Sequence, residues 1–164
     1  MLITTDPAAL KPLLLSQARL LGLDLGAKTI GLAIGTLDVG IATPLTTIRR
    51  TKFQQDAAQL MALVLKEKIA ALVLGLPFNM DGSEGSRAQS TRAFARNLGP
   101  FSPPPILLFD ERLTSAAALE GMKDAGLSRR NREAMIDAAA GAIILQDALD
   151  RLTTISPSAM KPSD

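Results

Sequence analysis

Short apolar runs broken by glycines open the main body of the chain and predict β-strands. Residues 19–24 and 30–36 are two such runs joined by a tight turn, and residues 40–48 add β-branched side chains after another turn. We expect these segments to form a three-stranded meander, with Pro44 favouring an edge position because proline cannot donate to a strand ladder. Asp6 followed by Pro7 is typical of a helix start, so residues 1–17 are expected to form a short helix or an extended arm.

The apolar spacing changes from that of strands to that of helices at residue 53. The elements expected from there on are helix 53–68, strand 70–76, helix 86–98, strand 106–111 and helices 113–125 and 132–152. This order predicts an α/β protein with a ribonuclease H-like fold, in which a mixed five-stranded sheet is flanked by helices. The sheet would combine the three-strand antiparallel meander with parallel strands after it. Doubly wound folds share much of this order.

The length of 164 residues fits a single domain. We expect an N-terminal extension at residues 1–17, a ribonuclease H-like domain at residues 18–152 and a C-terminal tail at residues 153–164. No stretch reaches the roughly 20 apolar residues of a membrane span, and polar residues and a proline interrupt any secretory signal at the N-terminus. These features predict a cytoplasmic protein without a membrane partner.

Four absent residue types narrow the chemistry, because the chain contains no His, Cys, Trp or Tyr. Their absence excludes serine and cysteine triads, imidazole bases and thiolate or imidazole zinc sites. Carboxylate, lysine, hydroxyl and arginine chemistry remains, and carboxylate oxygens suit Mg²⁺ or Mn²⁺. A formal net charge of +2 and a pI near 9.2 weakly favour anionic partners.

Three acidic positions stand out from their apolar surroundings. Asp24 lies within the first strand, Glu111 ends a buried-type strand, and Asp137 interrupts the apolar face of the last helix. Because strand side chains alternate between faces, only one of Asp110 and Glu111 can join Asp24. Gly141 and other small residues share a helix side with Asp137, so that side can approach a sheet closely.

Three converging carboxylates would repel one another unless a cation lay between them. Two divalent ions about 3.5–4 Å apart activate a water and neutralise a leaving oxygen without a histidine base. We therefore expect Asp24, Glu111 and Asp137 to be catalytic metal ligands. The structural alternatives are ion pairs with neighbouring arginines, namely Arg112 for Asp110 or Glu111, and Arg130 or Arg132 for Asp137.

Phosphate contacts are expected near the turn after Asp24 and in the polar loop at residues 75–85. The loop has backbone amides and leads into a helix N-terminus, both of which suit phosphate. Solvated turns and an ordinary capped loop are the structural alternatives. The residues predicted to bind substrate are Lys28, Asn79, Ser83, Arg87, Arg112 and Thr114.

Four motifs occur in a specific order along the chain. They are residues 22–28 (GLDLGAK), residues 75–77 (GLP) with 81–83 (DGS), residues 110–114 (DERLT), and residues 136–140 (IDAAA) leading to 143–146 (IILQ). At these residues the chain resembles the YqgF family of pre-16S rRNA nucleases, also described as Holliday-junction-resolvase-like proteins. The resemblance spans about residues 21–150 and implies a ribonuclease H-like fold with acidic active-site positions at Asp24, Glu111 and Asp137. Thr29 departs from the arginine usual in that family.

The leading hypothesis is a metal-dependent endonuclease that uses Mg²⁺ or Mn²⁺ to hydrolyse phosphodiester bonds. The resemblance implies 5′-end maturation of pre-16S rRNA during ribosome biogenesis, with nucleic acid and pre-ribosomal particles as partners. A Holliday junction resolvase acting on four-way DNA and a non-catalytic ribosome-assembly or nucleic-acid-binding factor are the alternatives. An actin-like or sugar-kinase ATPase is a third, from the Asp24-x-Gly26 pattern, but the single-domain length opposes it. Both a monomer and a homodimer are compatible with the sequence.

Overall fold

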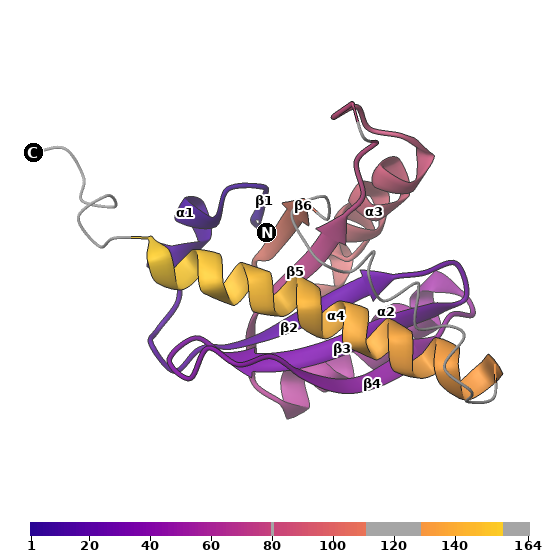
Figure 1. Ribbon diagram of the computed structural model, residues 1–164, viewed down its shortest axis with the longest axis horizontal. Helices are drawn as coiled ribbons and strands as arrows, with labels where there is room; N and C mark the ends of the chain where they lie inside the picture. Colours follow the sequence, from indigo (N-terminus) through magenta and orange to yellow (C-terminus); the bar gives the residue numbers. More distant parts are fainter. Residues whose placement is uncertain (80, 111–128, 156–164) are drawn as a thin grey trace, which may run out of the picture.

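The computed structural model describes residues 1–79, 81–110 and 129–155, without the side chains of residues 129–136 (Figure 1). The predicted helix at residues 113–125 lies outside this part of the chain. So do Glu111, Arg112 and Thr114, and the side chains of Arg130 and Arg132.

One mixed sheet of six strands forms the centre of the molecule, in the order β1-β6-β5-β2-β3-β4 (Figure 1). The strands are β1 (Ile3–Thr4), β2 (Arg19–Leu25), β3 (Thr29–Thr36), β4 (Thr43–Arg49), β5 (Ile69–Leu76) and β6 (Ile106–Asp110). Strands β2, β3 and β4 are an antiparallel meander, whereas β5 is parallel to both β2 and β6. The predicted class and strand order are confirmed, including the edge position of the strand that holds Pro44.

The predicted number of five strands is one too low, because β1 adds a sixth at the other edge. Ile3 and Thr4 pair in parallel with Ile106 and Leu107, and the Ile3 side chain packs against the core. Two residues are too few to produce the alternation that marks a strand in a sequence. The helix start predicted at Asp6 is confirmed, since its carboxylate accepts a hydrogen bond from the Ala8 amide at 3.0 Å.

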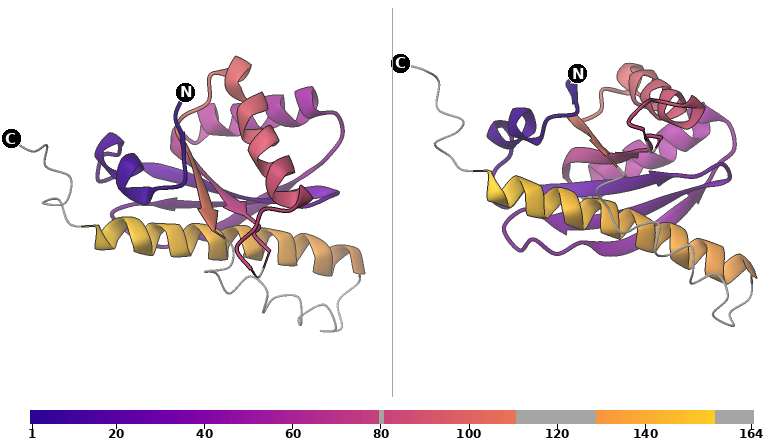
Figure 2. Two further views of the ribbon diagram at one scale, coloured as in Figure 1. Left: turned by 90° about the horizontal axis from the view of Figure 1, so that it is seen from above. Right: turned by 45° about the horizontal axis from the view of Figure 1, so that its top comes forward.

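Helices cover both faces of the sheet (Figure 2). They are α1 (Pro7–Leu10), α2 (Phe53–Lys66), α3 (Ser86–Asn97) and α4 (Arg129–Thr154), with short 3-10 turns at η1 (Lys11–Leu13) and η2 (Gly99–Phe101). Helix α4 crosses one face over β2 and β3, while α2 and α3 pack on the opposite face against β5. No helix in the described part of the chain is long and apolar enough to cross a membrane.

The alternation of side chains along β2 determines which face each residue joins. Leu21 and Leu23 belong to the core under α2 and α3, whereas Leu20 belongs to the core under α4. Gly22 faces α4 as well, because a Cβ added there would lie 2.7 Å from Cβ of Leu145. Asp24 is two residues further along the strand and therefore lies on the α4 face.

Glycines allow α4 to lie directly on the sheet backbone. A Cβ added at Gly31 of β3 would lie 1.9 Å from the backbone oxygen of Asp137, and one added at Gly141 of α4 would lie 3.0 Å from the Gly31 oxygen. Glycine weakens a strand interior, so its presence here is explained by the close approach of another backbone. The small-residue side of α4 inferred from the sequence is the side that contacts the sheet.

We predict that Gly31→Ala lowers the free energy of unfolding by about 3 kcal/mol, the upper end for overpacking, because backbone rather than a flexible side chain blocks the new methyl group. Gly99→Ala is the control, since its Cβ would meet only the end of the Met1 side chain at 3.4 Å. Urea unfolding of both variants measures the difference. Equal stability of the two variants would contradict the close contact between α4 and β3.

Candidate functional site

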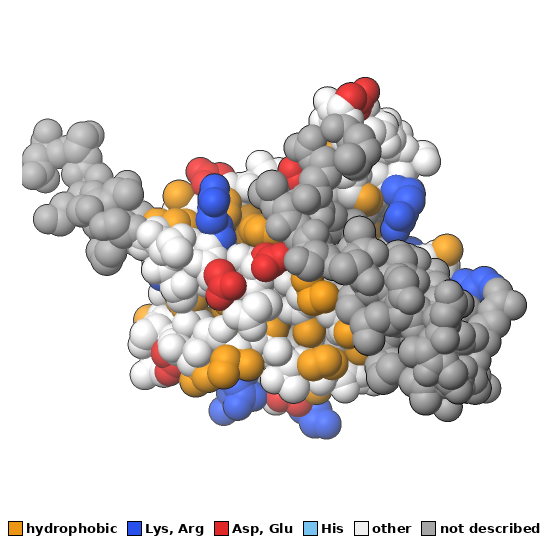
Figure 3. Space-filling model, in the orientation of Figure 1, with side chains coloured by type: hydrophobic (Ala, Val, Ile, Leu, Met, Phe, Trp, Pro, Cys, Tyr) orange, Lys and Arg blue, Asp and Glu red, His pale blue; other side chains and the backbone are white. Residues whose placement is uncertain are grey.

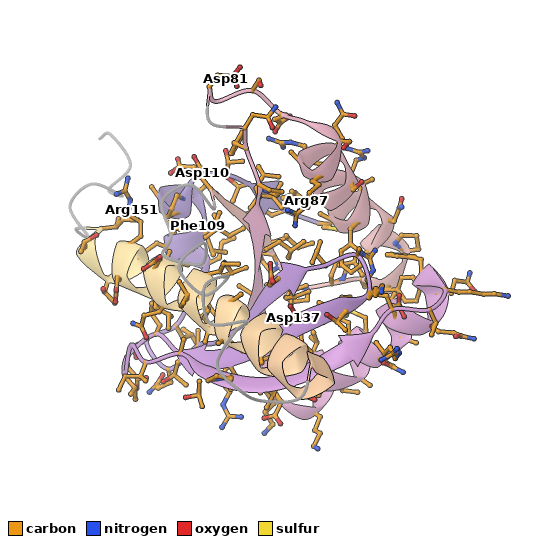
Figure 4. All side chains as sticks on the ribbon, turned by 45° about the vertical axis from the view of Figure 1, so that its right-hand side comes forward. Asp81, Arg87, Phe109, Asp110, Asp137 and Arg151 are labelled. Carbon is orange, nitrogen blue, oxygen red and sulfur yellow. The ribbon has the colours of Figure 1, made fainter. Side chains whose placement is uncertain are left out.

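Two of the three predicted acidic residues meet on the α4 face of the sheet. Asp24 is the cross-strand partner of Gly31, and Gly31 lies against the backbone of Asp137 near the start of the described α4 side chains. Both carboxylates are half-buried. Figure 4 shows Asp137 on the side of α4 that faces the strands. The close packing of α4 on the sheet thus brings Asp137 of α4 and Asp24 of β2 to the same part of the sheet face.

Thr29 is a contact of this site that the sequence predictions missed. Its hydroxyl donates a hydrogen bond to the carboxylate of Asp137. Thr29 precedes Gly31 by two residues on β3, so both face α4. That alternation is the signal in the sequence that would have identified Thr29. A neutral donor beside Asp137 orients the carboxylate without neutralising its charge.

The third predicted acid, Glu111, lies outside the described residues, so the three-carboxylate site stays a prediction. Asp110 ends β6 and lines a cavity with Asp147 and Asp150 of α4. Across the described residues, no group of three or more His, Cys, Asp and Glu side chains is placed to hold a metal ion. Asp24 and Asp137 are the members of the predicted set that lie in this range.

An acidic cavity of about 460 Å³ lies between the N-terminal segment, the end of β6 and the C-terminal half of α4. Acidic side chains gather over this part of the α4 face in Figure 3, and Figure 4 shows Phe109, Asp110 and Arg151 around it. Burial raises the pKa of Asp147 above its ordinary value of 3.8, and the nearby Asp150 carboxylate raises it further. The sequence predictions did not include this cavity.

The loop residues predicted to bind substrate, Asn79 and Ser83, hydrogen-bond to one another. The amide of Asn79 donates to Oγ of Ser83 at 3.0 Å, and that hydroxyl donates to Asp81 at 2.6 Å. Asp81 lies in the loop that projects away from the sheet (Figure 4). These contacts favour the structural alternative for Asn79 and Ser83, in which their side chains maintain the shape of the loop.

Two of the predicted basic contacts lie near the turn between β2 and β3. Lys28 is exposed in that turn, and its carbonyl accepts a hydrogen bond from the Arg50 amide at 2.8 Å. Arg87 is exposed in the first turn of α3 and lines a cavity with Arg50 beside Gly26. Their role as substrate contacts stays a prediction, and Arg112 and Thr114 lie outside the described range.

The meander followed by parallel strands, with acids converging under a long C-terminal helix, defines an α/β protein of the ribonuclease H-like class. A family model that matches most of the chain agrees with this class. The chain belongs to the RuvX family, whose model, described as Holliday junction resolvase, matches residues 18–151.

Curated relatives match most of the chain. A protein of Rhodobacter capsulatus named "Putative pre-16S rRNA nuclease" is 59% identical over 133 residues, which are 81% of this chain and 84% of that protein. A protein of the same name from Beijerinckia indica is 50% identical over 152 residues, covering 93% of this chain and 92% of the relative.

A solved structure shares the fold at much lower identity. RuvC from T. thermophilus, in complex with a Holliday junction substrate, aligns with a TM-score of 0.52 and 15% sequence identity. The alignment covers 83% of this chain and 96% of the RuvC chain. At this identity the similarity supports the ribonuclease H-like fold, and the activity has to be inferred from the residues of the site.

We predict that Asp147→Asn raises the melting temperature at pH 7. The raised pKa of Asp147 means that folding disfavours its charged form, so the parent carries a penalty at neutral pH that protonation relieves. The difference between variant and parent should shrink as the pH falls through the pKa of folded Asp147 and vanish below about pH 3.8. Melting curves from pH 7 to pH 3.5 measure this, and a difference independent of pH would contradict it.

Proposed function

We propose that this chain is a metal-dependent endonuclease that hydrolyses phosphodiester bonds, with Asp24, Glu111 and Asp137 as the catalytic metal ligands. The observation that carries the proposal is the contact of Asp137 with Gly31, the cross-strand partner of Asp24. It gathers two carboxylates on one face in a chain that has no His or Cys. Such a chain needs another source of an activated water.

The chemistry of the donor set fits Mg²⁺ or Mn²⁺. Asp24 and Asp137 both offer carboxylate oxygens, which hard divalent ions prefer. A bound divalent ion would lower the pKa of a water and stabilise the charge of the cleaved phosphate. Thr29 would act by holding the Asp137 carboxylate in one orientation, as hydrogen-bonded neighbours of metal ligands do.

We infer that the substrate is pre-16S rRNA, cut during 5′-end maturation in ribosome biogenesis. Relatives named as pre-16S rRNA nucleases at 50–59% identity support this choice. Pre-ribosomal particles would then be partners, and the protein would act in the cytoplasm. Basic side chains on the exposed turn and on α3 suit a polyanionic substrate.

A junction resolvase that cuts four-way DNA is the second candidate, favoured by the description of the family model. Symmetric cuts across a junction require two sites related by a two-fold axis, so this function predicts a homodimer, whereas rRNA cleavage is compatible with a monomer. A non-catalytic assembly factor would bind nucleic acid without cutting it. The ATPase hypothesis loses support because the chain belongs to the RuvX family.

Asp24→Asn should reduce cleavage by at least about a hundredfold, because it removes the charge of a proposed metal ligand while preserving its size. The test incubates parent and variant with a pre-16S rRNA fragment and with a four-way DNA junction, in Mg²⁺, in Mn²⁺ and in EDTA. Asp38→Asn is the matched control, since Asp38 is an exposed acid in the turn after β3.

The pattern of products distinguishes the candidates. Metal-dependent cutting of the rRNA fragment alone supports the proposal, and paired symmetric cuts in the junction support the resolvase. Equal cleavage by parent and Asp24→Asn would refute the metal site. Binding without cleavage in every metal would indicate the assembly factor.

Thr29→Val is predicted to raise the metal concentration needed for half-maximal cleavage by about tenfold, because it removes the hydroxyl that holds Asp137. Thr29→Ser keeps that hydroxyl and should behave like the parent. Titration of Mn²⁺ against the cleavage rate measures both. If Thr29→Val and Thr29→Ser shift the titration equally, the hydrogen bond does not position Asp137.

A further inference from the structure

A cavity of about 260 Å³ lies on the sheet face opposite α4, between the β2–β3 turn and the start of α3. We name it the Arg50–Arg87 pocket. The residues that line it include Gly26, Arg50, Ser86, Arg87, Ser90 and Phe94. Among the described residues, the charged side chains that line it are these two arginines. The pocket is therefore electropositive.

Arg50 is held in place at the wall of this pocket. Its Nη1 donates to the carbonyl of Gly26 at 2.7 Å, and its guanidinium carbon lies 5.8 Å from the ring centre of Phe94. Its backbone amide also bonds to the turn. These contacts use one N–H and one flat face of the guanidinium, and no ion pair with a described acid neutralises its charge. Its remaining donors are preorganised for an anion.

Arg87 and two serine hydroxyls provide further donors on the opposite wall. Arg87, Ser86 and Ser90 are exposed residues of the first turns of α3, and no described acid pairs with the Arg87 guanidinium. Helix α3 has no acidic residue in its first turn, and its N-cap Gly85 makes no side-chain cap. The dipole of α3 at its N-terminus adds to the positive potential set by the arginines.

We propose that the Arg50–Arg87 pocket binds a backbone phosphate of the nucleic-acid substrate, at a nucleotide flanking the phosphate that is cut. This inference rests on the proposed nuclease function. Asp24 is followed directly by Leu25 and Gly26, which line the pocket on the other face, so the two sites meet around the end of β2. Figure 4 shows Arg87 on α3 and Asp137 on α4 with strands of the sheet between them.

The lining of the pocket favours a phosphate over a base. Phe94 is 4% exposed and lies under the Arg50 guanidinium, so its ring is not available for base stacking. The guanidinium and hydroxyl donors match phosphate oxygens, which carry no sequence information. The pocket would therefore fix the register of a nucleic-acid strand across the end of β2 without selecting its sequence.

Arg87→Gln tests the pocket, with Arg96→Gln as the matched control. Arg96 is an exposed arginine in the last turn of the same helix and lies outside the pocket. Fluorescence anisotropy in EDTA measures the Kd of a labelled single-stranded RNA fragment and of a DNA of the same sequence over a series of salt concentrations. Arg87→Gln should weaken binding about three- to tenfold and lower the salt slope by about one, whereas Arg96→Gln should bind like the parent.

A methylphosphonate scan locates the contact. Neutral methylphosphonates replace the phosphates of the oligonucleotide one at a time. A methylphosphonate at one position flanking the cut phosphate should weaken binding of the oligonucleotide to the parent. The same methylphosphonate should cause no further loss of binding to Arg87→Gln. A sensitivity that persists unchanged in Arg87→Gln would overturn the assignment of that phosphate to the pocket.

A second variant in the pocket distinguishes loss of the phosphate contact from loss of helix structure in Arg87→Gln. Ser90→Asp adds a negative charge to the pocket and should also weaken binding, while Gln89→Asp adds the same charge at an exposed neighbour that does not line the pocket. Parent-like binding by both Arg87→Gln and Ser90→Asp would overturn the proposal. Equal losses in Arg87→Gln and Arg96→Gln would indicate general charge attraction and would overturn it too.

Titration with inorganic phosphate tests the other source of the same chemistry. Saturable phosphate binding that Arg87→Gln abolishes, with oligonucleotide binding unchanged, would make this a small-anion site and overturn the proposal.

Because oligonucleotide binding is measured in EDTA, it is independent of cleavage. If the parent binds through the pocket but does not cut, the nuclease function fails and the pocket stands; if the parent cuts but Arg87→Gln binds normally, only the pocket fails.

Discussion

The contact between the backbones of α4 and β3 is the constraint on which the acidic site depends. With Gly31 and Gly141 facing each other, no side chain separates the helix from the strand. The Asp137 carboxylate therefore reaches Thr29 on β3, and the cross-strand partner of Gly31 is Asp24. A larger residue at Gly31 would push the helix outward, and the two acids would separate with it.

The sheet also separates the two acids of the proposed metal site from the two arginines of the Arg50–Arg87 pocket. Its α4 face carries Asp24 and Asp137, and the opposite face carries Arg50 and Arg87 beside the β2–β3 turn. A phosphate backbone is repelled by the first face and attracted by the second. A bound cation would reverse the sign of the acidic face. In the proposed function, a bound cation would therefore allow one nucleic-acid strand to contact both faces.

The sequence predicted the elements that rest on long patterns and missed those that rest on single contacts. Alternation and helical spacing were sufficient for the meander, the parallel strands and the inward side of α4 around Gly141. The two-residue strand β1 has no pattern to detect. The hydrogen bond of Asn79 with Ser83 depends on loop geometry, which composition does not determine, so the sequence could not predict it. Thr29 is uncharged, and only its alternation with Gly31 along β3 indicates that it faces Asp137.

Asp56 shows why burial of an acid is not by itself a sign of a catalytic site. It is only 3% exposed, yet its carboxylate accepts hydrogen bonds from both the amide and the hydroxyl of Thr51 at 3.0 and 3.1 Å. Its place in the first turn of α2 also suits a negative charge. Local donors of its own loop therefore satisfy Asp56. Asp24 and Asp137 differ because two segments far apart in the sequence bring them to the same face of the sheet.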